Sequence, residues 1–377
     1  MKKPLLSRLH FNRKALVSLM AVLFGLIAGA LFILCIGHNP FTGYKFLFQG
    51  GLMNIERIGN SLAMATPLIL TGLSLAFASR TGLFNIGAAG QMLFGGFMTT
   101  VFALLNPALP RVILLPAVIL IGMLSGAVWA GIPGFLKAKF NCNEVVITIM
   151  MNWIAYWIVA YVIPNYFPES LHVKTISQRV PDAASLRTGW LTELFNGSYL
   201  NIGIFLALLA AVAVSFILNR TVMGYELKAV GHNRMAAEYA GIGVSRNIVL
   251  AMVIAGALAG LAGVTYYCGY SVNMQINVLP SQGFDGIAIS LLGLGTPVGV
   301  IVSAFFFGIM QAGKNFMSSN TAIPPEIADT IIATIIYFAA AGVILDRALT
   351  FFSNRGRRLR KPREKQPEAT LTKGGAE

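Results

Sequence analysis

Two amide side chains and four glycines stand in an otherwise apolar stretch at residues 84–96, FNIGAAGQMLFGG. An amide both donates and accepts hydrogen bonds, which is the chemistry that binds a polar solute such as a sugar or a nucleoside. On a regular helix, Gly87 and Gln91 share a face through their i,i+4 spacing. Asn85 then points about 120° away from Gln91. Gln91 is therefore the candidate solute contact, and Asn85 is expected at the start of the helix.

Two interpretations of this stretch remain open. In the first, the glycines let a neighbouring helix pack closely, Asn85 caps the helix, and Gln91 bonds across the packed face. In the second, Gln91 faces a passage for a polar solute. The candidate residues for the passage or its packing are Asn85, Gly87, Gly90, Gln91 and Asp285.

Catalytic and metal-binding chemistry find no support in the residue pattern. The four histidines lie in separate loops or termini and suggest neither a catalytic triad nor a metal site. The acidic residues lie in loops or at the ends of apolar stretches, so we expect no carboxylate at the middle depth of a membrane, where a proton-coupled carrier usually places one. The three cysteines are scattered and show no disulfide or metal spacing.

One segment comes close to a nucleotide-binding motif. Residues 308–315, GIMQAGKN, match the phosphate-binding loop up to the last position, where Asn315 replaces the serine or threonine that holds magnesium. The segment ends an apolar stretch and no strand precedes it. We expect no ATP site, no enzymatic activity and no resident cofactor or metal in this chain.

The composition places the chain in a membrane. Of its 377 residues, 56% are hydrophobic and 11% are charged, whereas charged residues make up about a quarter of a soluble domain. Apolar stretches of about 20 residues, the length of a membrane-spanning helix, recur along the chain. The net charge of +14 comes largely from basic residues beside the first and last stretches, which favours contact with anionic lipids over nucleic acid. We therefore expect an all-α integral membrane protein.

The apolar pattern predicts about ten transmembrane helices. Their expected ranges are 15–37, 60–79, 83–105, 112–136, 145–167, 199–218, 247–268, 284–295, 297–313 and 327–347. A break is expected at Gly295-Thr296-Pro297, because proline disfavours helix in the residue before it and this tripeptide is typical of a turn. With ten helices, both termini lie on the side richest in lysine and arginine, which is the cytoplasmic side.

The predicted organisation is one transmembrane domain with basic ends and two long polar loops. Its parts are a basic cytoplasmic N-terminus at 1–14, the transmembrane domain at 15–347, an external loop at 164–198, a cytoplasmic loop at 219–247 and a basic cytoplasmic tail at 348–377, which we expect to be disordered. Residues 66–87 and 283–302 are each two apolar segments hinged at a glycine-containing turn. Transporters often carry such broken pairs in their two halves, so a pseudo-repeat and a chance likeness both remain open.

The cytoplasmic loop contains a stretch suited to a short helix. Its sequence, NRMAAEYAG at 233–241, offers Asn233 as an N-cap and Gly241 at the C-terminal end. A helix this short is not stable alone in water. Either a cytosolic partner subunit holds it, or it lies on the lipid headgroups.

Three segments carry a family resemblance. The spacing of Gly231, Ala236-Ala237 and Gly241-Ile242 resembles the coupling loop of permease subunits of bacterial ABC importers, in the branch that handles ribose, other simple sugars and nucleosides. FNIGAAGQ is similar to that branch's Asn-x-Gly-x-x-Gly-Gln signature, and GFDGIAISLLG at 283–293 resembles its later signature. Within that branch, the residues of these segments most resemble those of nucleoside-type permeases that work with a basic-membrane-protein-like lipoprotein. Ala89 departs from the acidic residue common in close relatives, which weakens any inference about the substrate from this motif.

This resemblance implies a multi-subunit machine in the bacterial inner membrane. Two permeases, here this chain and a different one, form the pathway, while cytoplasmic ATPase subunits hold ATP and magnesium and an external lipoprotein delivers nucleosides or simple sugars. The residues that the resemblance assigns to ATPase coupling are Gly231, Asn233, Ala236, Ala237, Glu238, Tyr239 and Gly241. A stand-alone secondary carrier or facilitative channel for a small polar solute is the alternative.

Overall fold

A computed structural model describes residues 13–166, 172–173 and 176–342 of the chain. The predicted tail at 348–377 and nearly all of the predicted N-terminal segment at 1–14 lie outside the described residues. The helices and strands are α1 (Arg13–Cys35), α2 (Pro40–Leu52), α3 (Ile55–Ser79), α4 (Ala88–Leu105), α5 (Arg111–Phe140), α6 (Glu144–Tyr166), β1 (His172–Val173), β2 (Ile176–Ser177), α7 (Gly189–Leu194), α8 (Gly203–Arg220), α9 (Val222–His232), α10 (Arg234–Tyr239), α11 (Val244–Val264), the π-helix η3 (Thr265–Tyr270), α12 (Gln282–Leu292), α13 (Pro297–Thr321) and α14 (Glu326–Ala340).

Within the described residues, eight helices are long and apolar enough to cross a membrane. They are α1, α3, α4, α5, α6, α8, α11 continued by η3, and α13. Helices α12 and α14 occupy the two remaining predicted spans but have only 11 and 15 residues. The fold is that of an all-α integral membrane protein, and the number of ten crossings and the side of each terminus stay predictions.

Helix α2 lies between the first two predicted spans, where the apolar pattern predicts no helix. Asn39 caps it by accepting a hydrogen bond from the Phe41 amide at 2.9 Å, and Pro40 occupies its first turn, where a missing N–H is tolerated. Its buried face packs on α13: a Cβ at Gly50 would lie 2.8 Å from the Gly313 Cα. This contact is far apart in sequence, so no local apolar pattern revealed the helix.

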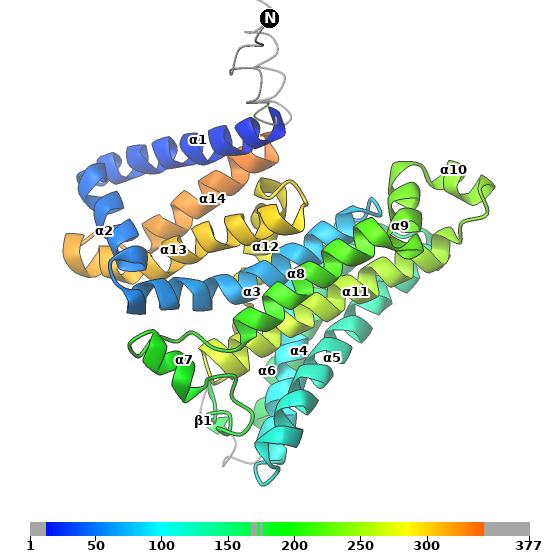
Figure 1. Ribbon diagram of the computed structural model, residues 1–377, viewed down its shortest axis with the longest axis horizontal. Helices are drawn as coiled ribbons and strands as arrows, with labels where there is room; N and C mark the ends of the chain where they lie inside the picture. The colour runs from blue at the N-terminus through cyan, green and yellow to red at the C-terminus, as the bar shows by residue number, and fades with distance from the viewer. Residues whose placement is uncertain (1–12, 167–171, 174–175, 343–377) are drawn as a thin grey trace, which may run out of the picture.

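Helices α3, α4 and α11 form the buried centre of the bundle. Helices α4 and α5 pack on one side of α11, while α1, α13 and α14 gather on the other side of α3 (Figure 1). Helices α5 and α11 meet at glycines: a Cβ at Gly260 would lie 3.1 Å from the Gly126 Cα. Small residues permit this close backbone approach in membrane helix bundles.

The bundle has two ends that differ in character. Helices α9 and α10 project at one end, called the α10 end below, and α7 with the β1–β2 hairpin lies at the opposite, α7 end (Figure 1). The loops at 219–247 and 164–198 therefore lie at opposite ends of the bundle, as their predicted positions on opposite faces of the membrane require. Which end is cytoplasmic stays a prediction.

The predicted break at Gly295-Thr296-Pro297 is confirmed. Helix α12 ends at Leu292 and α13 begins at Pro297, with the Thr296 hydroxyl accepting a hydrogen bond from the Gly299 amide at 3.2 Å. Leu294 and Gly295 have φ values of 57° and 60°, in the left-handed region. The chain reverses direction here, so α12 and α13 are two separate helices.

Candidate functional site

The two amides of the 84–96 stretch bond to each other. Helix α4 begins only at Ala88, so Asn85 lies in a non-helical segment before it. The Asn85 Nδ2 donates to the Gln91 Oε1 at 3.0 Å, and the Gln91 Nε2 donates to the Asn85 Oδ1 at 2.9 Å. The expectation that Asn85 points away from Gln91 is therefore wrong, because it assumed a regular helix through both residues.

This amide pair is enclosed by the bundle. Asn85 and Gln91 are each 1% exposed, and the Asn85 Oδ1 also accepts from the Gly87 amide at 3.1 Å. A Cβ at Gly87 would lie 3.0 Å from the Gln91 Nε2. In this conformation the amides satisfy one another, which favours the packing interpretation over a solute contact.

Gly90 marks a second polar contact at the start of α4, one that sequence reasoning missed. Its amide donates to the Asn152 Oδ1 at 2.8 Å, and the Asn152 Nδ2 donates to the Ile86 carbonyl at 3.1 Å. Asn152 is 2% exposed and lies in the middle of α6. An asparagine inside so apolar a span was the available signal, because a buried amide needs hydrogen-bond partners.

Asp285 corrects a further expectation. It lies in the first turn of α12, is 8% exposed, and receives a contact from the Gln311 Nε2 at 3.5 Å, near the middle of α13. The bundle therefore does hold a buried carboxylate at mid-length of a candidate span. Sequence reasoning placed Asp285 near the start of the span predicted at 284–295, and it does lie in the first turn of α12; the apolar pattern could not show that this turn lies beside the middle of α13.

At the α10 end, the stretch at 233–241 forms α10. The Asn233 Oδ1 accepts a hydrogen bond from the Ala236 amide at 3.1 Å and caps the helix. Gly241 ends it with a φ of 79°, a conformation that glycine adopts without steric cost. The loop turns back here, so α10 stands out from the bundle as a separate element.

Most of the α10 surface is exposed to solvent. Tyr239 is 93% exposed and Met235 is 70% exposed, and Ala236 and Glu238 are also exposed. Ala237 is 3% exposed and faces the rest of the chain. A projecting helix with large exposed apolar side chains is typical of a surface that docks on another protein.

The loop that bears α10 touches the bundle at Gly231. A Cβ at Gly231 would clash with the Arg80 carbonyl and would lie 3.1 Å from the Gly82 amide nitrogen. Arg80 and Gly82 belong to the turn that follows α3. The last residues of α9 therefore press directly on the backbone of that turn.

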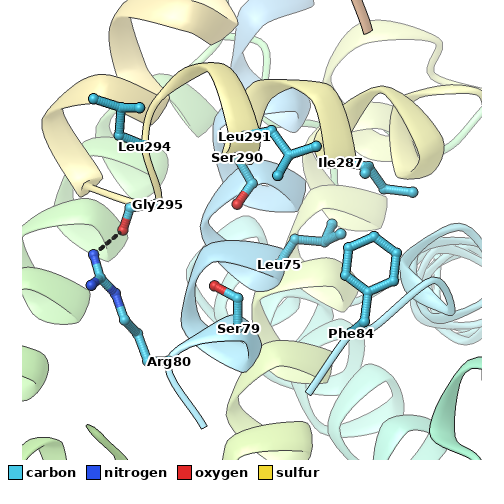
Figure 2. A pocket seen from close by; sticks show the side chains of 9 residues that line it. All are labelled: Leu75, Ser79, Arg80, Phe84, Ile287, Ser290, Leu291, Leu294 and Gly295. Atoms are coloured by element: carbon cyan, nitrogen blue, oxygen red, sulfur yellow. Dashed lines mark hydrogen bonds between the residues drawn. The ribbon is translucent and has the colours of Figure 1, made fainter. Parts of the chain in front are cut away.

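The same turn lines a cavity of about 330 Å³ against α12 (Figure 2). Arg80 points at the Gly295 carbonyl and donates to it from Nη2 at 2.6 Å. The side chains and backbone that enclose this space, called the Arg80 cavity below, come from Leu75, Ser79, Arg80, Phe84, Ile287, Ser290, Leu291, Leu294 and Gly295. No motif in the sequence singles out Arg80, so this contact was not predicted.

A second cavity lies at the opposite end of α12. It has a volume of about 160 Å³ and is called the Tyr266 cavity below; its walls come from Tyr266, Tyr267, Ser271, Gln275, Val278, Leu279, Pro280, Ser281 and Gln282. Tyr266 and Gln282 both line this cavity, so their polar groups lie around the same space. Tyr266 belongs to η3, and π-helical turns occur frequently at functional sites.

One face of α12 joins the two cavities. Side chains on this face recur every three or four residues and are exposed or half-buried: Ser281, Phe284, Ile287, Leu291 and Leu294, called the α12 stripe below. Ser281 lines the Tyr266 cavity, and Ile287, Leu291 and Leu294 line the Arg80 cavity. The stripe thus links the two cavities along α12, with polar groups at the end beside η3.

The loop at the α7 end is tied to η3 by Arg187. The Arg187 Nε donates to the Gly269 carbonyl at 2.8 Å, and its Nη2 donates to the Tyr270 carbonyl. Its guanidinium lies 4.9 Å from the centre of the Tyr199 ring. Burial lowers the pKa of this guanidinium. Arg187 therefore fixes the loop against η3, beside the Tyr266 cavity.

Two expectations about metal and nucleotide binding can be compared with the described residues. There, no three His, Cys, Asp or Glu side chains come together closely enough to hold a metal ion. Residues 308–315 lie wholly inside α13, so their backbone forms helix and not the loop that would cradle a phosphate.

Comparison with known proteins identifies relatives along most of the chain. A family model described as the permease component of branched-chain amino acid transport systems matches residues 57–340. The nucleoside ABC transporter permease protein NupB of Lactococcus lactis is 41% identical over 339 residues, covering 89% of this chain and 93% of its own. The guanosine ABC transporter permease protein NupP of Bacillus subtilis is 41% identical over 329 residues, covering 86% and 93%. The glucose ABC transporter permease protein TsgB13 of Haloferax volcanii is 30% identical and covers 85% of each chain.

Proposed function

The chain belongs to the family of permease components of branched-chain amino acid transport systems, and we propose that it is the permease subunit of an ABC importer for nucleosides in a bacterial plasma membrane. The observation that carries this proposal is 41% identity, along nearly the whole chain, to permeases named for nucleoside and guanosine transport. A permease named for glucose is less similar, at 30% identity over a comparable share. Nucleosides are therefore favoured over simple sugars as the substrate.

ATP hydrolysis is assigned to a cytoplasmic partner that docks on α10. Support comes from the shape of this element: it projects from the bundle, is capped by Asn233, and exposes Tyr239 and Met235. A helix of six residues has little stability of its own in water, so contact with a partner's surface would stabilise it. The α10 end is then the cytoplasmic end.

The substrate pathway is assigned to the α12 stripe, facing a second permease chain. The stripe links two cavities, and its α7 end carries the polar Tyr266, Gln282 and Ser281. Hydroxyl and amide groups suit the polar edges of a nucleoside, and aromatic rings suit the faces of its base. A second chain opposite the stripe would complete the wall that this chain leaves open.

The α7 end is assigned to the external binding lipoprotein. Trp190 and Leu194 on α7 are 56% and 62% exposed, and Arg187 fixes the loop beside the Tyr266 cavity. A lipoprotein seated here would release its substrate next to the polar end of the stripe.

Uptake by the reconstituted complex tests this function. The chain, its ATPase subunit and the second permease are placed in proteoliposomes, with the lipoprotein and radiolabelled guanosine on the side that the α7 end faces. Uptake should require ATP inside the vesicles, should persist when a protonophore collapses the proton gradient, and should be inhibited by unlabelled nucleosides but not by glucose.

Two outcomes would reject the proposal. Uptake that continues without the ATPase and stops on addition of the protonophore would identify a secondary carrier, whose proton could bind the buried Asp285. ATP-dependent uptake that glucose inhibits and nucleosides do not would assign the chain to simple sugars.

A further inference from the structure

Three turns from distant parts of the chain meet at the α10 end. They are the turn after α3 with Arg80 and Gly82, the end of α9 at Gly231, and the turn between α12 and α13 at Gly295. We call this contact the Arg80 junction, made of Arg80, Gly82, Gly231 and Gly295. It is the place where the loop that carries α10 comes closest to the helix that carries the α12 stripe.

The first half of the junction is backbone against backbone. A Cβ at Gly231 would clash with the Arg80 carbonyl, so no side chain separates the end of α9 from the turn after α3. A flexible side chain absorbs small movements by changing rotamer, whereas close-packed backbone does not. A displacement of α9 and α10 would therefore be passed directly to Arg80.

The second half of the junction is the Arg80 guanidinium on the turn after α12. The Nη2 donates to the Gly295 carbonyl at 2.6 Å, beside the carboxyl end of a helix, where positive charge is stabilising. Within residues 13–166 and 176–342, Arg80 forms no ion pair, and its buried Nε has no hydrogen-bond partner. Among these residues, the Arg80 guanidinium bonds to one carbonyl group alone, that of Gly295. A movement of either turn can therefore break or restore this hydrogen bond.

The junction also faces the pathway. Arg80 and Gly295 line the Arg80 cavity together with Ile287, Leu291 and Leu294 of the α12 stripe (Figure 2). A shift of the Gly295 turn moves the end of α12 and so changes the shape of this cavity. The path from α10 through α9, Arg80 and Gly295 to α12 is continuous in contacts that the structure contains.

We propose that Arg80 is the positioning residue that couples movement of the ATPase partner to the pathway, by linking the end of α9 to the end of α12. This inference rests on the proposed function, since it takes α10 as the ATPase dock and the α12 stripe as the pathway wall. Arg80 does not touch ATP and need not touch the substrate. It acts by holding the turn after α3 and the turn after α12 in a fixed position relative to each other.

The variant that tests this role is Arg80→Met. Methionine keeps the apolar stem that lines the cavity and removes every donor, whereas Arg80→Lys keeps one charged donor. Arg57→Met is the matched control, because Arg57 also donates to a backbone carbonyl, from Nη1 to Gly50 at 3.3 Å, but lies at the opposite end of α3 from Arg80. All three are purified as the full complex and reconstituted into proteoliposomes.

The readout is guanosine taken up per ATP hydrolysed, which a loss of folded protein alone would not change. Arg80→Met should assemble and hydrolyse ATP, with uptake per ATP reduced about tenfold, in the usual range of coupling between distant sites. Arg80→Lys should recover part of that loss, and Arg57→Met should keep the wild-type ratio.

The failures of the two proposals are distinguishable. A wild-type ratio in Arg80→Met, or an equal fall in Arg80→Met and Arg57→Met, would overturn the role of Arg80 while leaving the importer function in place. A wild-type complex that takes up no guanosine with ATP would overturn the proposed function itself.

Discussion

The Asn85–Gln91 pair is a small closed unit of buried polar groups. Each amide donates to and accepts from the other, and both are almost completely enclosed. A buried amide that loses its partner costs free energy because it can bond neither to protein nor to water. The pair therefore fixes the non-helical entry to α4 in one conformation.

Replacing Gln91 with leucine should destabilise the chain by about 1–3 kcal/mol, because the Asn85 amide is left buried and unpaired. The double change Asn85→Leu with Gln91→Leu should cost less than the sum of the single changes, since it leaves no orphaned amide. The measurement is the thermal unfolding midpoint of the purified complex in detergent. Additive effects, or a loss of uptake in Gln91→Leu with an unchanged midpoint, would favour a solute contact instead.

Gly90 should tolerate no side chain. A Cβ there would lie 2.7 Å from the Asn152 Cα, a backbone atom that cannot move aside. Gly90→Ala should therefore lower stability by about 1–3 kcal/mol, the usual cost of overpacking. Gly189→Ala is the control, because nothing lies within 4 Å of a Cβ at Gly189. The two variants are compared by unfolding midpoint, and equal midpoints would show that α4 and α6 are less tightly packed than the structure has them.

At the residue scale, spacing found the polar positions but not their partners. The pattern singled out Asn85 and Gln91, yet a regular helix was assumed through residues that precede α4, and their mutual bond was missed. Asn152 and Arg80 were missed altogether. Their partners, Gly90 and Gly295, lie far away in sequence, so only the packed bundle brings them together.

At the scale of helices, α10 depends on how it ends. Gly241 has a φ of 79° and turns the chain back toward α11. Gly241→Val should strain this turn by about 1–2 kcal/mol, since a side chain with a Cβ resists the left-handed conformation. The strain should tilt α10 and reduce guanosine uptake per ATP, while the chain stays in the membrane.

The neighbouring Gly243 provides the control for this change. Its φ is −70°, and a Cβ there would meet only the Arg246 Cβ, at 3.7 Å. Gly243→Val should therefore leave the uptake ratio close to wild type. Normal coupling in Gly241→Val would remove α10 from the ATPase dock, whereas an equal loss in both variants would point to general disruption of the loop.

Local sequence signals were sufficient where the residues that end one helix and begin the next lie at that boundary themselves. The Gly295-Thr296-Pro297 turn was predicted because proline and glycine act on the backbone where they stand. Helix α2 was not, because its buried glycines gain stability only against α13. The bounds of α12 were displaced by two or three residues, from 284–295 to Gln282–Leu292, since an apolar stretch does not reveal where a helix begins within it.

Over the whole molecule, composition and charge predicted the class of fold. Hydrophobic residues make up 56% of the chain, and so large a share can be buried only in a helical membrane bundle or in a very large core. The arrangement of helices, with α3, α4 and α11 at the centre, was not predictable. It depends on glycine contacts, such as those of Gly126 with Gly260, that give no periodic signal of their own.

The orientation of the bundle follows from the distribution of its charges and is open to direct measurement. The α10 end should be cytoplasmic and the α7 end external. In a variant without natural cysteines, Glu193→Cys on α7 should react with a membrane-impermeant maleimide on intact cells. Tyr239→Cys on α10, at a position 93% exposed, should react only after the cells are permeabilised.

This labelling experiment tests the predicted orientation of the bundle. Both loops are exposed at opposite ends of the bundle, so accessibility reports the side of the membrane and not burial. If a cysteine at residue 239 were labelled from outside, the α10 end would be external, and the ATPase dock would be impossible because ATP is hydrolysed in the cytoplasm. The external assignment of α7 would fall with it, since the two ends lie on opposite sides of one bundle.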